Sequence, residues 1–335
     1  MPEQLSLFDE EEPLGWPEYL GHLKPLPLRG RSHLTIEKLA DKLAGLLLGF
    51  WLGSTLAEPA VGLSAREVRR RWGGPVSGEP SGEKAPAALE ALLACFLAGS
   101  RFGTELTLAE LGAVWQEELP ADFPWKAVKQ LREGLAPPAS GIGTEAEGEH
   151  ALSVPVGLFA GALFPGHPQD ATQTGLERAG LVGAGASRHL AAWLAAMTSI
   201  AFVESHYRWT FELALSWVPA PIRLGKLLRH SMRLHDSAYA PRQSYDALGE
   251  LFRLPPDHKG HAKPPFEHQS WRSALVNAGV ISLALLYGEG ELGKSLATAT
   301  EGGWEASLNT GATGALLGTS LGAKKLLKDL LGVAS

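Results

Sequence analysis

Two widely separated stripes of glycine constrain the fold of this chain more than any other sequence feature. Glycine recurs every four residues from Gly45 to Gly53, and the same spacing returns from Gly314 to Gly322. Residues four apart lie on one face of an α-helix, and each glycine inside a helix costs about 1 kcal/mol relative to alanine. The sequence therefore predicts two helices that approach each other closely in the middle of a helical bundle.

The remaining apolar residues also follow a helical spacing from residue 35 onward, and convincing alternating strands are absent. Thr107 and Glu110 have the spacing of a capping box at one helix start. Further helices are predicted at residues 87–97, 108–118, 127–134, 156–163, 188–204, 207–217, 222–235, 271–287 and 292–300. We therefore expect an all-α fold.

The first 34 residues differ from the rest of the chain in composition. They contain five prolines and the acidic run 9–12, and such a segment cannot bury enough apolar surface to order itself. We expect residues 1–34 to be a disordered acidic, proline-rich tail and residues 35–335 to form one helical domain, which a chain of 335 residues allows.

Charge and cysteine content limit the classes of function. The formal charge of −6 comes without a long basic stripe, so direct binding of nucleic acid is not expected. Cys95 is the single cysteine, which excludes a disulfide within the chain and fits a reducing compartment. The longest uncharged stretches fall short of the roughly 20 residues of a membrane span. We expect a cytoplasmic protein, without a signal peptide or a membrane partner.

Six segments, taken in order, resemble the ADP-ribosylglycohydrolase family over about residues 38–325. They are residues 41–49 with 58–59, 164–168 with 171, 195–204, 277–278, 284–290, and 302–304 with 309–318. The resemblance implies a compact orthogonal multi-helix bundle. It also implies two central magnesium ions, which activate water and ribose hydroxyls so that an ADP-ribosyl bond is cleaved. Two acidic clusters and nearby acids supply the ligands in that family.

The chain departs from the family at both clusters. At the first, one carboxylate remains as Glu83 and the second position is the cation Lys84. At the second, one carboxylate remains as Glu305 and the other position is Ser307. In the first helix, Ser54 stands where the family has the aspartate of a Gly-Asp pair. Two divalent ions require several carboxylates to balance a charge of +4. These replacements predict that the magnesium site is lost.

We therefore predict a catalytically degenerate member of the family, a pseudoenzyme that binds a ligand or partner and needs no metal or other cofactor. Only Glu83 and Glu305 remain as catalytic candidates. Lys84 is expected to replace the metal charge by pairing with Glu83 or Glu305, unless Glu83 and Lys84 are simply exposed loop residues. The expected ligand is ADP-ribose or a related nucleotide. The residues predicted to line the ligand cleft are Ser54, Lys84, Ser307 and Asn309.

Two other functions stay open at this point. The first is an active hydrolase that removes ADP-ribosyl groups with an altered Mg²⁺ site, whose candidate metal ligands are Glu83, Glu305 and Ser307. The second is a purely structural or scaffold protein.

The N-terminal segment contains a separate short motif. Gln4, Leu5, Leu7 and Phe8, with serine between the two leucines, resemble the peptide by which many bacterial proteins bind the DNA polymerase sliding clamp. In such peptides glutamine forms hydrogen bonds and the Leu-Phe pair fills an apolar pocket. We expect these four residues to bind the sliding clamp, with an N-terminal strand or patch folded onto the domain as the alternative.

Overall fold

The computed structural model describes Trp16 and residues 22–28, 34–76, 85–142, 149–252 and 271–331. Within these ranges the predicted all-α fold is confirmed, because the β-type pairings that occur there are two isolated bridges, Ser64–Gly303 and His150–Ser273. The α-helices are α3 (Ile36–Ala57), α4 (Ala65–Trp72), α5 (Ala87–Phe102), α6 (Leu108–Glu118), α7 (Lys126–Arg132), α8 (Val154–Leu163), α9 (Pro168–Arg178), α10 (Ala186–Ala201), α11 (Tyr207–Ser216), α12 (Arg223–Asp236), α13 (Pro241–Leu251), α14 (Ala274–Gly288), α15 (Leu292–Gly302), α16 (Ala306–Leu321) and α17 (Ala323–Leu331).

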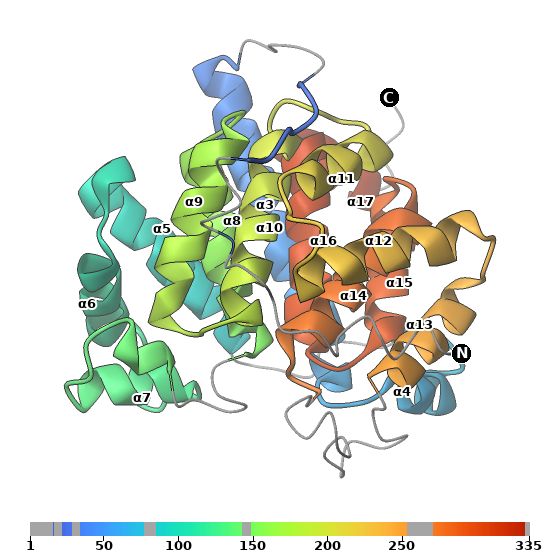
Figure 1. Ribbon diagram of the computed structural model, residues 1–335, viewed down its shortest axis with the longest axis horizontal. Coiled ribbons are helices and arrows are strands. Elements are labelled where there is room, and N and C mark those ends of the chain that lie inside the picture. Colours follow the sequence, from blue (N-terminus) through green and yellow to red (C-terminus); the bar gives the residue numbers. More distant parts are fainter. Residues whose placement is uncertain are drawn as a thin grey trace.

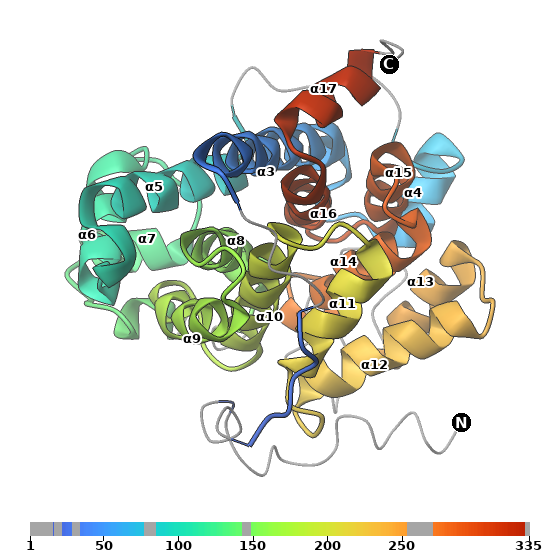
Figure 2. The same ribbon diagram turned by 90° about the horizontal axis from the view of Figure 1, so that it is seen from above.

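The helices form one bundle around a small set of central elements. Figure 1 shows α5, α6 and α7 at one end of the molecule and α4, α12 and α13 at the other, with α8, α10, α14 and α16 between them. Seen from above in Figure 2, α3 and α16 run side by side next to α17 and α15. The central helices carry the segments that build the candidate site.

The glycine stripes meet as predicted. A Cβ atom added to Gly49 would lie 2.0 Å from the carbonyl oxygen of Gly314, and one added to Gly45 would lie 2.1 Å from that of Gly318. The pairing is antiparallel, so Gly53 meets the backbone of Thr310. Backbones at this distance leave no room for a side chain, which explains why both helices accept the cost of glycine.

One glycine of the second stripe has a different role. Gly322 lies after the end of α16, where its φ of 82° is in the left-handed region that favours glycine. A Cβ atom at this position would lie 2.2 Å from Oδ2 of Asp41, whose Oδ1 accepts a hydrogen bond from the backbone N–H of Lys324. The spacing predicted a third packing glycine, and the structure corrects this to a turn between α16 and α17.

The predicted helices agree with the structure to within a few residues, apart from α5, which continues five residues further than predicted. The predicted helix at 108–118 has the same bounds as α6, and its Thr107–Glu110 capping box is confirmed by both reciprocal hydrogen bonds. The prediction missed α4, α17, α9 and α13, and the last two begin at Pro168 and Pro241. Proline is favoured in the first turn of a helix because its missing N–H has no partner there anyway, so these prolines start helices.

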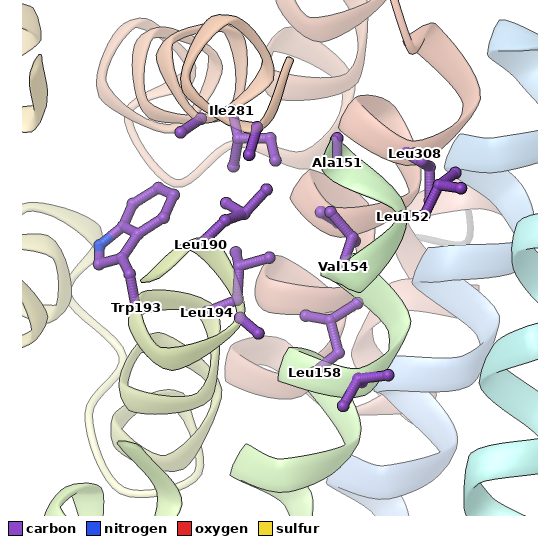
Figure 3. Close-up of a cluster of buried hydrophobic side chains, with 14 of the residues drawn as sticks. Ala151, Leu152, Val154, Leu158, Leu190, Trp193, Leu194, Ile281 and Leu308 are labelled. Atoms are coloured by element: carbon purple, nitrogen blue, oxygen red, sulfur yellow. The ribbon is translucent and has the colours of Figure 1, made fainter. Parts of the chain in front are cut away.

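The core lies where α8, α10, α14 and α16 converge. In Figure 3 the α10 side chains of Leu190 and Trp193 point toward Ile281 of α14, while Leu152 and Leu308 lie side by side next to α8. All five side chains are buried in one apolar cluster. This packing holds α14 and α16 against α8 and α10, and the candidate site lies at the N-terminal ends of α14 and α16.

Part of the N-terminal segment packs on the domain. Trp16 is fully buried in the main core cluster, with its ring 5.5 Å from that of His189 on α10. The backbone N–H of Leu26 donates a hydrogen bond of 3.0 Å to Oγ of Ser216, and Leu28 packs against the core. The predicted tail is therefore attached to the helical domain at these residues, while 1–15, 17–21 and 29–33 lie outside the described part.

Two helical stretches, Ile36–Ala60 and Ala87–Glu105, are long and apolar enough to cross a membrane by length and composition. Each buries one face inside the bundle, and core helices of soluble proteins pass the same test. The absence of a membrane partner stays a prediction.

Candidate functional site

A cleft of about 190 Å³ opens beside the N-terminal end of α16. Its walls come from the end of α3, the starts of α5 and α7, the segment 150–152 and the segment before α14. Leu152 and Leu308 belong to both the core cluster and the cleft lining, so the core forms part of the cleft wall. The charged and aromatic residues that line the cleft are Glu58, Trp125, Lys126, His150, Trp271, Arg272 and Glu305.

A tight turn between α15 and α16 places Glu305. Gly303 and Trp304 both have positive φ, at 70° and 61°, a conformation that costs free energy for a large side chain. Hydrogen bonds hold it: Trp304 N–H donates to the carbonyl of Leu63 at 2.7 Å, and Gly62 N–H donates to the carbonyl of Trp304 at 2.8 Å. Glu305 is thereby fixed as the N-cap residue of α16.

A buried asparagine pair ties this turn to the start of α14. Oδ1 of Asn277 accepts hydrogen bonds from Nδ2 of Asn309 at 2.7 Å and from the backbone N–H of Glu305 at 3.1 Å. Nδ2 of Asn277 donates to the carbonyls of Trp271 and Ser273. Both asparagines are fully buried. They hold in place the two segments that carry Glu305 and Arg272.

Glu305 lies next to a cation. Its Oε1 is 3.4 Å from Nε of Arg272, and the Glu305 side chain is 9% exposed while that of Arg272 is 37% exposed. The Arg272 guanidinium also stacks over the ring of Trp271, at 4.7 Å from the centroid. The sequence prediction missed Arg272, because it is 33 positions from Glu305 and belongs to none of the segments that resemble the family.

The predicted site residues that the structure describes fall into two groups. Glu305 and Ser307 line the cleft, and Oγ of Ser307 donates a hydrogen bond to the carbonyl of Ser54. Ser54 and Asn309 are fully buried and do not line it; the Ser54 hydroxyl donates to the carbonyl of Trp51. The predicted residues that lie outside the described part of the chain are Gln4, Leu5, Leu7, Phe8, Glu83 and Lys84.

Comparisons with known proteins now assign the family. A sequence model described as ADP-ribosylglycohydrolase matches residues 35–333. The chain belongs to the ADP-ribosylglycohydrolase family. A solved structure titled "ADP-ribosylglycohydrolase-related protein complex" is similar with a TM-score of 0.54, at 16% identity, over 87% of this chain and 91% of that one. At that identity the likeness shows the fold alone. No curated protein sequence matches the chain.

Magnesium, which the ADP-ribosylglycohydrolase family implies, does not fit the described residues of this cleft. They supply two carboxylates, on Glu58 and Glu305, and two cations, on Lys126 and Arg272. Within the described ranges no group of three or more His, Cys, Asp or Glu side chains could hold a metal ion. Two magnesium ions bring a charge of +4 and prefer octahedral oxygen ligands, whereas the Glu305 carboxylate already faces a guanidinium.

Proposed function

We propose that this member of the ADP-ribosylglycohydrolase family binds ADP-ribose or a related nucleotide in the cleft without metal-dependent hydrolysis. The observation that carries the proposal is the ion pair between Arg272 and Glu305. A carboxylate held by a protein cation contributes less to binding a divalent ion. The family's cleft then remains as a binding site.

The chemistry of the cleft suits a nucleotide. Trp271 is partly exposed in the cleft lining and offers an aromatic surface for a base. Lys126 offers a cation for a pyrophosphate, and hydrogen bonds between such a cation and phosphate are among the strong ones. These two properties support a ligand that combines a planar base with negative charge.

Isothermal titration of ADP-ribose into the full chain tests this function. We expect binding in EDTA with the same affinity as in magnesium. Lys126→Ala should weaken binding by about 10- to 100-fold, because a hydrogen bond to a charged group contributes about 1.5–3 kcal/mol. Lys129→Ala is the matched control, since Lys129 lies on the same helix, is 74% exposed and does not line the cleft. Binding only in the presence of magnesium, or an equal loss in both variants, contradicts the proposal.

A second proposal concerns the N-terminal segment, which carries the clamp-like motif and is attached to the domain through Trp16. We infer that Gln4, Leu5, Leu7 and Phe8 bind the sliding clamp, while Trp16 attaches the segment to the domain. Phe8 and Trp16 are eight positions apart in the chain, a distance that spans at most roughly 26–29 Å when extended. A bound clamp is therefore held close to the helical domain.

Capture of the full chain on purified sliding clamp tests this tether. The wild-type chain should be retained, and Leu7→Ala combined with Phe8→Ala should abolish retention, because the apolar pocket loses both side chains. Leu14→Ala is the control in the same segment, outside the motif. Equal retention of the wild type and the double variant removes the proposal.

A further inference from the structure

The Glu305 carboxylate is in a position where it needs a positive charge. Its side chain is 9% exposed, between the buried asparagine pair and the cleft. A carboxylate removed from water is costly unless it is paired and hydrogen-bonded. In a metal site a divalent ion provides this charge.

The backbone around Arg272 is fixed from several directions. The carbonyl of Arg272 accepts a hydrogen bond of 2.8 Å from the N–H of Ala151, and the neighbouring carbonyl of Trp271 accepts one from Asn277. The guanidinium rests on the Trp271 ring. An arginine held in this way loses little further side-chain freedom when it pairs with Glu305, so the pair is preorganised.

We propose that Arg272 is a permanent counter-cation of Glu305 and occupies the electrostatic role of a divalent ion in this cleft. The inference rests on the proposed metal-independent function and names the residue responsible for it. A fixed guanidinium within 3.4 Å of the carboxylate repels a divalent ion and satisfies the charge that would attract one. Removal of the Arg272 charge should therefore create affinity for magnesium at Glu305.

A second ion pair in the same protein provides a matched comparison. Nε of Arg242 lies 3.0 Å from Oε1 of Glu301, whose side chain is 10% exposed, and the pair joins α13 to α15. Both pairs combine a buried glutamate with a partly exposed arginine, but only the Arg272 pair lines the cleft. Loss of either arginine should destabilise the fold, whereas only loss of Arg272 should produce a response to magnesium.

The test is thermal unfolding of the full chain with and without about 10 mM magnesium chloride, because an ion that binds the native state raises its Tm. The wild type should show no rise in Tm. Arg272→Gln should have a lower Tm that magnesium raises, and Arg272→Lys should restore the wild-type behaviour. Arg242→Gln should have a lower Tm with no response to magnesium.

A double variant controls for loss of folding in Arg272→Gln. Arg272→Gln combined with Glu305→Gln replaces the ion pair by a neutral pair of similar shape, so it should fold and show no response to magnesium. A rise in the wild-type Tm with magnesium, or a folded Arg272→Gln variant that does not respond, overturns the inference. Failure of ADP-ribose to bind would remove the proposed function but leave these results unchanged, so the two failures are distinguishable.

Discussion

Asn277 on α14 and Asn309 on α16 are joined by a hydrogen bond of 2.7 Å from Nδ2 of Asn309 to Oδ1 of Asn277, and neither side chain is accessible to solvent. Oδ1 of Asn277 also accepts the N–H of Glu305. One amide oxygen thus holds together two helix starts and the turn that places the acid of the cleft.

Replacement of Asn277 by leucine should destabilise the protein by about 3 kcal/mol or more. The change leaves the N–H of Glu305 and the amide of Asn309 without this acceptor, and each unsatisfied buried group costs about 1–3 kcal/mol. Urea unfolding measures the loss. Ser282→Ala is the control, because the buried Ser282 hydroxyl donates to the carbonyl of Gly279 in the same helix; it should cost less than about 1 kcal/mol. Equal losses of unfolding free energy in Asn277→Leu and Ser282→Ala would show that the hydrogen bonds of Asn277 contribute no more to stability than the hydrogen bond of the Ser282 hydroxyl.

The glycine contact between α3 and α16 gives a second prediction. Gly49→Ala should cost more than about 3 kcal/mol or prevent folding, because the new methyl group would lie 2.0 Å from the backbone oxygen of Gly314. Gly249→Ala in α13 meets nothing within 4 Å and should stabilise the protein by about 0.5–1 kcal/mol. Chemical denaturation of both variants measures the difference, and a mild effect at Gly49 would contradict the close approach.

The features that could be predicted from the sequence are those encoded locally. Helical spacing and the repeat at Gly45 and Gly314 predicted the central helix pair, because residues four apart share a helix face whatever surrounds them. Arg272 could not be predicted as the partner of Glu305, since their contact depends on the packing of α14 against α16. Trp16 is an isolated aromatic residue in a proline-rich segment, so its sequence neighbours give no indication that it packs beside His189 in the core.

The burial of Trp16 leads to a third prediction. Trp16→Ala should destabilise the domain by about 3–5 kcal/mol, as expected when a buried tryptophan is truncated. Trp51→Ala is the control, because Trp51 is 49% exposed on α3 and should cost less than about 1 kcal/mol. Thermal unfolding measures the Tm of both variants against that of the wild type. Similar Tm values for Trp16→Ala and the wild type would mean that the N-terminal segment is not part of the core.

The lowered pKa of His230 on α12 leads us to expect a loss of stability in acid. Burial, with a smaller contribution from nearby Arg233, holds the pKa of His230 below its usual 6.5. The unfolded chain therefore takes up a proton first as the pH falls through about 6.5, so acid favours unfolding. His230→Gln should reduce the fall in urea midpoint between about pH 7.5 and about pH 5.5. Identical pH profiles for the variant and the wild type would contradict this origin.

The central claim is that the cleft binds without metal-dependent hydrolysis, and release of ADP-ribose from a modified protein target tests it most directly. Chromatography can follow free ADP-ribose over time with the full chain in magnesium and in EDTA. The account predicts release no faster than the protein-free control in either buffer. Magnesium-dependent release that Glu305→Gln abolishes would contradict it and establish an active hydrolase with an altered metal site.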